Sequence, residues 1–389
     1  MSEATDLRER LIALTGDLVR IDARNPWLIE GGPGEAAIAA DLAARASALP
    51  RAEVTVEEVE PGRPNVLALL RGSGGGPTLC LNAHLDTVGD ASWPDRSMTP
   101  LVDGDRLIGL GAADDKGHCA AVLLALEALA HRPAPLRGDV LAAFVMDEEA
   151  TSLGTQALVR DHHPDAAIVV EPFGLGRAIV THQGFGWIDI TVNGRAAHGS
   201  APERGIDAIS RLALVVERLD ALGRGWAAAP HPLNGATVYH ASTVSGGSDY
   251  ATYPARATLG IEIGTQPGET IEARVADIEA IFEGLRLELP QFEAEIDVRL
   301  DRDPFLAVGH ERLMTALDRA GDAVIGRPFL PAGENAWMDA ALIQAAGIPT
   351  LSIGASGANI HAPDEWVSIT ELEAVTHILE ATCIDFCDA

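Results

Sequence analysis

The chain has 389 residues, of which 47% are hydrophobic and 22% are charged, so it has the composition of a globular protein and is long enough for two domains. Its formal net charge is −29 and it has no cluster of Lys or Arg, which argues against binding to nucleic acid or to an anionic membrane. We see neither a secretory signal nor an apolar stretch that could span a bilayer, and we expect a soluble, cytoplasmic protein.

Positive charge comes almost entirely from arginine, because Lys116 is the single lysine. The four cysteines form no C-x-x-C motif, so we expect two buried thiols and a pair near the C-terminus rather than a zinc ribbon or a redox motif. These cysteines are Cys80, Cys119, Cys383 and Cys387.

The first 180 or so residues alternate short apolar runs with helical patterns, which is typical of an α/β domain with a mainly parallel sheet. Asp114 or Asp115 is expected to cap a helix that ends near Ala130. The apolar runs predict strands at Val66–Leu70, Leu79–Leu81, Val140–Met146 and Ala167–Val170.

The pattern changes between residues 182 and 292, where the order of elements predicts a β-α-β-β-α-β insert. The α/β pattern then resumes with a strand at Pro349–Ile353 and a closing helix from Thr370 to about Phe386. We therefore predict one α/β domain made of residues 1–181 and 293–389, and a smaller α+β domain made of residues 182–292. The elements expected in the insert are Gly186–Val192, Asp207–Leu222, Thr237–Val244, Ala255–Ile263, Thr270–Phe282 and a strand near Phe292–Val298.

Several of the apolar strands lead directly into side chains that can bind metals. In open α/β sheets, ligands bind at the carboxyl ends of strands, so these side chains can converge on one crevice. They are His84 and Asp86, Glu148 and Glu149, Glu171 and, after a glycine-rich loop, His361.

The residue types indicate which metals would fit. His84 and Asp86 are two residues apart and face the same side of an extended segment, which suits a ligand histidine oriented by a carboxylate. Imidazoles and carboxylates without a thiolate suit zinc, cobalt or manganese in a hydrolytic site. Taken singly, Asp114 is most simply a helix cap and Asp147–Glu149 a solvated loop; their shared position at strand ends and a helix start favours the metal site.

With these residues in place, the sequence resembles the two-metal amidohydrolase and peptidase family over essentially its whole length. That family includes acetylornithine deacetylase, succinyl-diaminopimelate desuccinylase, aminoacylase and glutamate carboxypeptidase. The motifs that carry the resemblance are residues 21–26, 32–35, His84–Val88, Gly109–Gly117, Asp147–Glu149, Gly194–Pro202 and Ile360–Val367.

The resemblance implies a zinc-peptidase-like catalytic domain with an inserted lid and dimerisation domain. It also implies two zinc ions per subunit, with cobalt or manganese as alternatives. Asp114 would bridge the two ions, His84 and Glu171 would complete one site, and Glu149 and His361 would complete the other.

The same resemblance assigns the remaining roles. Asp86 would orient His84, and Glu148 would be the general base that acts on a metal-bridging hydroxide or its parent water. His198 would reach across a homodimer and stabilise the oxyanion in the partner's active site. The implied partners are a small-molecule substrate and a second copy of the chain.

The lid departs from the family pattern. The family usually has Asn three residues before the position of Pro254 and, ten residues after it, an Arg that binds the substrate's carboxylate; here these are Ala251 and Gly264. Either Arg256 or another arginine does this work in a divergent lid, or the substrate lacks an α-carboxylate. Asp115 also replaces an apolar residue.

The function predicted from these observations is metal-dependent hydrolysis of an amide bond in a small N-acyl amino acid or related N-acyl compound. One alternative is an amidase or deformylase whose substrate has no α-carboxylate, and another is a dipeptidase or carboxypeptidase. A more distant alternative is an inactive homologue that only binds; the presence of every expected ligand, of Glu148 and of His198 speaks against it.

Overall fold

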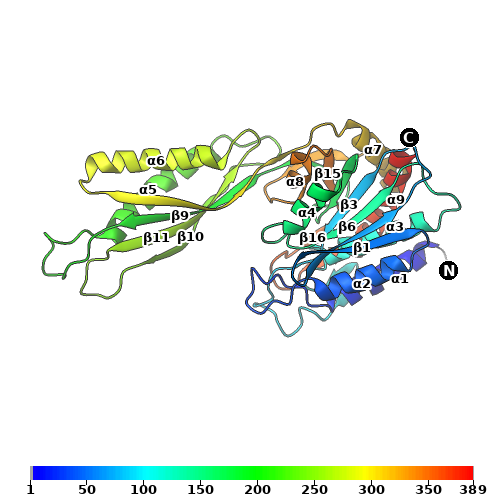
Figure 1. Cartoon of the computed structure of the whole chain (residues 1–389), viewed down its shortest axis with the longest axis horizontal. Coiled ribbons are helices and arrows are strands. Elements are labelled where there is room, and N and C mark those ends of the chain that lie inside the picture. Colours follow the sequence, from blue (N-terminus) through cyan, green and yellow to red (C-terminus); the bar gives the residue numbers. More distant parts are fainter. Residues whose placement is uncertain (1–2, 389) are drawn as a thin grey trace. The chain divides into compact units, whose positions relative to one another are not determined.

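The computed structural model describes residues 3–388 and confirms the predicted fold class (Figure 1). The chain forms two compact units. The first consists of residues up to 180, 307–331 and 338 onward, and the second of residues 181–306 and 332–337. The second unit extends beyond residue 292, where the sequence placed its end, because the strand that follows residue 292 completes that unit's sheet.

A large sheet organises the first unit, and its central strands β6, β3, β7 and β15 run parallel to one another. Every residue of these four strands is buried, as expected for a parallel sheet covered on both faces. The strand order is β1 (Ala52–Glu60), β2 (Arg63–Leu70), β6 (Val140–Val145), β3 (Leu79–His84), β7 (Ala166–Val170), β15 (Thr350–Ile353), β8 (Arg177–His182) and β13 (Phe305–Leu306), and β14 (Leu330–Glu334) pairs with β8.

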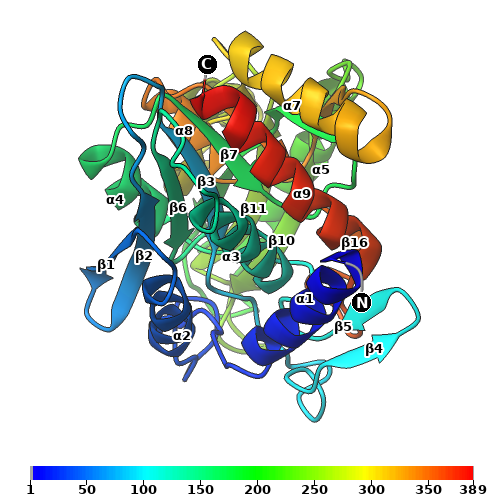
Figure 2. The same cartoon turned by 90° about the vertical axis from the view of Figure 1, so that its right-hand side faces the viewer.

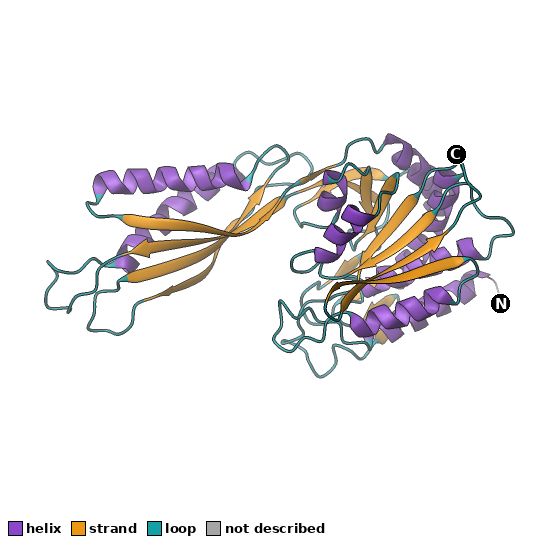
Figure 3. Cartoon of the chain, viewed as in Figure 1, coloured by secondary structure: helices purple, strands orange, loops and turns teal. Residues whose placement is uncertain are grey.

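Helices cover the faces of this sheet (Figures 1 and 3). α3 packs against β3 and against α1 and α9, and it is apolar nearly all round because it is buried between them (Figure 2). α4 packs against α8, next to β6 and β15. The helices of this unit are α1 (Glu3–Val19), α2 (Ala36–Ser47), α3 (Lys116–Ala130), α4 (Leu153–Asp161), α7 (Glu311–Ile325), α8 (Ala340–Ala345) and α9 (Ile369–Cys387).

A small antiparallel sheet joins two distant segments of the first unit. It has the order β16 (Gly357–Ala358), β17 (Trp366–Ser368), β5 (Arg106–Ile108) and β4 (Leu101–Asp103). Trp366 pairs with Ile108 across this sheet. The loop that follows β5 is thereby held beside the loop that precedes β17.

The second unit has the predicted β-α-β-β-α-β order: β9 (Gly184–Asn193), α5 (Ala208–Ala227), β10 (Tyr239–Gly246), β11 (Arg256–Thr265), α6 (Ile271–Glu288) and β12 (Glu293–Arg302). Its sheet is antiparallel, with the order β10-β11-β9-β12. Ile188, Ile190 and Val192 of β9 form a buried core with both helices, while the alternate residues face away from that core.

The predicted cap of α3 is wrong in its mechanism. Asp115 occupies the N-cap position but its side chain makes no capping hydrogen bond. Its carboxylate accepts hydrogen bonds from the backbone N–H of His84 and from the ring of His118 instead. By contrast, Asp207 caps α5 and Ser368 caps α9 in the ordinary way, by accepting from a backbone N–H three residues on.

The single lysine and the cysteines are buried. Lys116 lies in the first turn of α3 and is fully buried, where its Nζ donates to the carbonyl oxygen of Ile21 at 2.8 Å. Burial lowers the pKa of this amine to about 8. All four cysteines are buried free thiols, including the two near the C-terminus.

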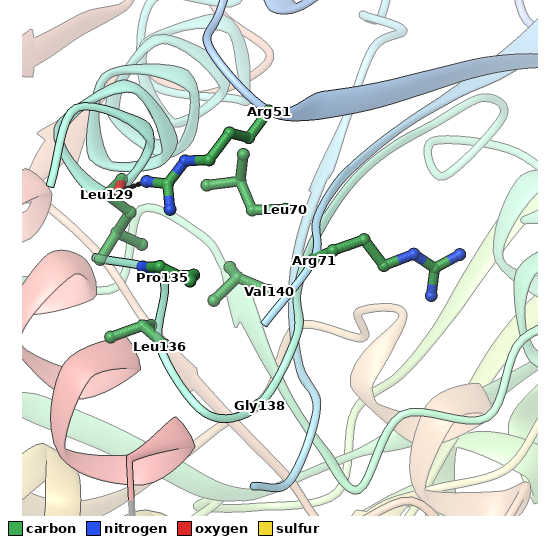
Figure 4. Close-up of a pocket in the computed structure, with 8 residues that line it drawn as sticks. All are labelled: Arg51, Leu70, Arg71, Leu129, Pro135, Leu136, Gly138 and Val140. Carbon is green, nitrogen blue, oxygen red and sulfur yellow. Dashed lines mark hydrogen bonds between the residues drawn. The ribbon is translucent and has the colours of Figure 1, made fainter. Parts of the chain in front are cut away.

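Within the described residues no helix is both long enough and apolar enough to cross a membrane. A small pocket lies at the carboxyl end of α3, where Arg51 donates to the carbonyl oxygens of Leu129 and Ala130 (Figure 4). This pocket contains none of the metal-binding candidates, and Arg51 satisfies helix-terminal carbonyl groups there.

Candidate metal centre

The polar side chains that follow the strands meet at one edge of the large sheet. His84 is the last residue of β3, Glu148 comes three residues after β6, and Glu171 follows β7 directly. Because these strands are parallel neighbours, their carboxyl ends lie side by side. The structure therefore brings together groups that belong to three separate parts of the sequence.

Asp114 lies between two imidazoles. One of its carboxylate oxygens is 2.8 Å from Nε2 of His84, and the other is 3.2 Å from Nε2 of His361. The same His361 nitrogen is 3.0 Å from a carboxylate oxygen of Glu149. The pairing of β5 with β17 explains why Asp114 and His361 meet, since each lies in a loop beside one of these strands. A carboxylate with one imidazole at each oxygen is suited to bridging two metal ions.

Two overlapping groups of ligand atoms are compact enough to hold a metal ion. The first group consists of His84, Asp114 and Glu149, and the second of His84, Glu148 and Glu171; in each, the atoms lie within 4.8 Å of one another. His84 Nε2 is 4.0 Å from Glu171 Oε1. The structure thus gathers all five predicted ligands, while the division of the carboxylates between two ions stays a prediction.

The carboxylates of this site carry more negative charge than their protein neighbours neutralise. Burial, together with nearby acidic groups, raises the pKa of Glu148 and of Glu171 well above the usual range. Burial and the charge of Asp114 raise the pKa of Glu149 to about 7. Buried anions are costly unless a cation compensates them. The donor set and this charge excess fit divalent cations such as zinc, cobalt or manganese.

Asp86 contacts more of the site than the ring of His84, which is the one role that the sequence predicted for it. His84 Nδ1 is 3.1 Å from the backbone oxygen of Asp86 and 3.5 Å from its carboxylate. The carboxylate itself accepts hydrogen bonds from the backbone N–H groups of Glu148 and Glu149, at 3.0 and 3.2 Å. Asp86 therefore fixes the segment that carries the predicted base as well as the ring of His84.

A buried network that the sequence did not predict supports the turn before Glu148. Asp147 has a φ of 70°, a left-handed conformation in which Asp and Asn are over-represented among non-glycine residues. Its Oδ1 accepts from Arg63 and from Asn25, both at 2.9 Å. Arg63 is in turn held by Glu35 through two hydrogen bonds. Asn25 and Glu35 lie in segments that carried the family resemblance, but no role had been assigned to either of them.

Glu365 holds the loop that contains Asp114. Its carboxylate accepts from the backbone N–H groups of Gly111, Ala113 and Asp114, at 2.9, 2.9 and 3.0 Å. Burial raises the pKa of Glu365 to about 7. Glu365 lies in the same motif as His361, but no function was predicted for it. Contacts to backbone groups leave no signal in the residue types of a sequence.

His198 is the one predicted site residue that belongs to the second unit. It lies in an exposed loop, and its Nδ1 accepts a hydrogen bond from the backbone N–H of Ser200 at 3.2 Å. A backbone N–H can only donate, so the neutral ring carries its proton on Nε2. That nitrogen can therefore donate a hydrogen bond to another molecule.

The sequence pattern of Peptidase family M20/M25/M40 matches residues 80–385. The chain belongs to this family. It is 27% identical to N-formyl-4-amino-5-aminomethyl-2-methylpyrimidine deformylase of Bacillus subtilis over 370 residues. This alignment covers 85% of this chain and 84% of the relative. It is also 26% identical to succinyl-diaminopimelate desuccinylase of Alkalilimnicola ehrlichii, over 83% of this chain and 88% of the relative.

Solved structures share the fold. Aminopeptidase PepT of Bacillus cereus superposes with a TM-score of 0.79 and 21% identity over 97% of this chain and 98% of that chain. The Bacillus subtilis YXEP protein, described as a dinuclear metal-binding peptidase of the M20 family, has a TM-score of 0.69 and 18% identity, over 98% of this chain and 99% of that chain. The chain is thus an M20-type hydrolase, from a family that typically binds two metal ions and cleaves amide bonds.

Gly354 provides a test of how closely this edge of the sheet is packed. A Cβ at this position would lie 2.0 Å from the backbone oxygen of Glu171, so Gly354→Ala forces the Glu171 segment to move. We expect the free energy of unfolding to fall by about 1–3 kcal/mol, together with the metal content of the purified protein. Chemical denaturation and elemental analysis measure these two quantities.

Gly225→Ala is the matched control for this substitution. Gly225 lies inside α5, and a Cβ there would meet nothing within 4 Å. This change should raise stability by about 0.4–1 kcal/mol and leave the metal content unchanged. If Gly354→Ala behaved like the control, the close packing of Gly354 against Glu171 would have no bearing on the site.

Proposed function

We propose that the protein is a metal-dependent hydrolase that cleaves the amide bond of a small N-acyl compound, as a deacylase does. The observation that carries this proposal is the position of Asp114, with one carboxylate oxygen on His84 and the other on His361. Buried acidic side chains with raised pKa values surround it. The deformylase and desuccinylase named above, which cover more than four fifths of the chain, support the same class of reaction.

Two zinc ions, or cobalt or manganese ions, are the cofactors that this donor set favours. Asp114 would hold both ions, His84 and Glu171 would complete one site, and Glu149 and His361 the other. When bound, such ions make a water molecule acidic enough to attack near neutral pH and polarise the carbonyl group of the substrate.

Glu148 is the group that we propose to move the proton. It is held near the ligands by the hydrogen bond from its backbone N–H to Asp86, and its raised pKa favours proton uptake. As general base it takes a proton from the attacking water, and as general acid it passes that proton to the nitrogen of the leaving amine. The amide C–N bond then breaks, and a carboxylate and an amine are released.

Glu148→Gln should abolish most activity without removing metal, because it deletes proton transfer and keeps a side chain of the same shape. We expect a decrease of about 10²–10⁴-fold in kcat, measured as amine release by the zinc-loaded protein.

His361→Ala should instead lower the metal content of the purified protein, because it removes a predicted ligand. Unchanged turnover in Glu148→Gln would rule out the base, and absence of zinc, cobalt or manganese from the wild type would favour the inactive homologue.

His198 is proposed to act from a second copy of the chain. Its exposed ring carries a proton on Nε2, as required of a donor to the oxyanion of an amide hydrolysis intermediate. In a homodimer formed through the second unit, each subunit would supply this donor to the active site of its partner. The second unit would then serve as both lid and dimerisation surface.

Mixing two inactive variants tests this arrangement. Glu148→Gln and His198→Ala should each be nearly inactive while retaining metal. After subunit exchange, a heterodimer contains one site with an intact Glu148 and an intact His198 from the other subunit. Activity should recover to at most about a quarter of the wild-type level, because half of the dimers are mixed and half of their sites are intact. No recovery in verified heterodimers would place His198 in its own subunit's site.

The surroundings of Gly264 bear on the choice of substrate. A Cβ at this position would lie 2.6 Å from the side-chain oxygen of Gln183 and 3.1 Å from the backbone nitrogen of Val238. Gln183 is fixed there by hydrogen bonds from its amide to the carbonyl oxygens of Asn234 and Ala236. A neutral amide therefore fills the space beside Gly264, the position at which the family resemblance implies an arginine.

Two other arginines of this sheet differ in their distance from Gly264. Arg256 is eight residues away along β11, which corresponds to about 26 Å, and it contacts Thr191. Arg302 is nearer, because Arg302 and Gly264 are both register partners of Phe185 in adjoining strands. The guanidinium of Arg302 lies over the ring of Trp337, 5.3 Å from its centre.

This face of the second unit favours a second candidate function, hydrolysis of an aromatic N-acyl amine that lacks an α-carboxylate. Phe185 lies 5.8 Å from Trp187 and 6.3 Å from Trp337, ring centre to ring centre, which gives a surface suited to a flat ring. The deformylase relative, which is named for a formylated aminomethylpyrimidine, supports the same candidate.

A panel of substrates and one double variant separate the two candidates. The panel contains N-acetyl and N-succinyl amino acids, dipeptides, and formyl and acetyl amides of aromatic amines. If the substrate has no α-carboxylate, the wild type should cleave only the last group, and Gly264→Arg combined with Gln183→Ala should gain activity on N-acyl amino acids. Gln183→Ala alone is the control. Efficient cleavage of N-acyl amino acids by the wild type would contradict this candidate. It would favour Arg302 as the group that binds the substrate's carboxylate.

A further inference from the structure

His118 is a buried histidine beside the metal centre to which neither the motifs nor the proposed mechanism gives a role. It lies in the first turn of α3 and has no exposed surface. Its Nδ1 is 2.7 Å from a carboxylate oxygen of Asp115 and 2.9 Å from the backbone oxygen of Ala113. Its Nε2 accepts a hydrogen bond from the backbone N–H of Ala355 at 3.0 Å.

These partners select one form of the ring. The N–H of Ala355 can only donate, so Nε2 of His118 carries no proton. The proton of the neutral ring is therefore on Nδ1, which donates to the carboxylate of Asp115 and to the carbonyl of Ala113. Both ring nitrogens are satisfied, and the imidazole has a single orientation.

The ring joins three segments that carry predicted metal ligands. Ala113 and Asp115 are the two neighbours of Asp114 in the sequence. The second oxygen of Asp115 accepts from the backbone N–H of His84 at 3.1 Å, which links the ring to the end of β3.

The third link is to the segment of Glu171. Ala355 lies just after β15, where the backbone N–H of Glu171 donates to the carbonyl of Ile353 at 2.9 Å. The intervening residue, Gly354, packs closely against both the backbone oxygen of Glu171 and Nε2 of His118. The position of Ala355 is therefore coupled to that of Glu171.

We propose that His118, together with Asp115, is a positioning residue of the metal centre. It holds the segments of His84, Asp114 and Glu171 at fixed spacing, and so sets the affinity of the site for metal without contacting the metal. This inference rests on the proposed two-metal site. A histidine that only filled space in the core would affect stability and leave metal affinity unchanged.

Three substitutions separate the contributions of the two ring nitrogens. His118→Phe keeps the volume of the ring and removes both hydrogen bonds. His118→Asn places an amide N–H near the position of Nδ1 and can retain the bond to Asp115. His118→Gln places an amide oxygen near the position of Nε2 and can retain the bond from Ala355.

The measurement is the zinc affinity of metal-free protein, determined by competition with a chelator, alongside thermal unfolding of the same metal-free samples. We expect His118→Phe to bind zinc about 10–100-fold more weakly than the wild type, as is typical when an outer partner of a metal site is lost. The Asn and Gln variants should each recover part of this affinity. His131→Gln, at the exposed end of the same helix, is the control and should bind zinc as the wild type does.

The outcomes distinguish this inference from the proposed function. Failure of the wild type to bind zinc, cobalt or manganese would overturn the proposed function. Wild-type binding together with unchanged affinity in a folded His118→Phe would overturn the positioning role alone. If His118→Phe does not fold, unchanged affinity in both the Asn and Gln variants would overturn it, and weakened affinity in either folded variant would support it.

Discussion

The concentration of buried carboxylates at one edge of the large sheet is the constraint on which the rest of the first unit depends. Asp86, Asp115 and Glu171 are almost fully buried. A buried negative charge is stable only where hydrogen-bond donors or cations compensate it. Backbone N–H groups donate hydrogen bonds to Asp86 and to Glu365. For the carboxylates around Asp114, the compensating cations are the metal ions that we propose. The conformation of the loops at this edge therefore depends on the hydrogen bonds that these acidic side chains accept.

The sequence was informative about this edge for a physical reason. Apolar strands that end in acids and histidines can be recognised one by one, and the rule that parallel strands end together then brings them to a common site. Supporting groups such as Arg63, Glu365 and His118 could not be identified in this way. They act on backbone atoms or on other buried acids, and each has a partner tens to hundreds of residues away along the chain. The expected cap of α3 was wrong because the carboxylate of Asp115 is taken by the backbone N–H of His84, which is distant in sequence, and by the ring of His118 in the same helix.

The second unit shows the complementary case. Alternation of apolar residues was enough to predict its strands and helices, because its core obeys the ordinary two-residue and 3.6-residue periods. Its sheet continues past residue 292 through β12, and residues 332–337 also belong to this unit. The meaning of Gly264 could not be read from the sequence alone. Gln183 is distant in sequence, and only the folded sheet places its amide against that glycine.

The burial of Lys116 has a practical consequence for the chemistry of the surface. Every basic side chain other than Lys116 and the histidines is a guanidinium, and the one ε-amine is enclosed in α3 with its nitrogen bound to the carbonyl of Ile21. Reagents that acylate lysine side chains, including many fluorogenic dyes and cross-linkers, will find no such group on the folded protein. A dye of this kind can therefore report a liberated amine continuously in the presence of the native enzyme, with no background from lysine labelling.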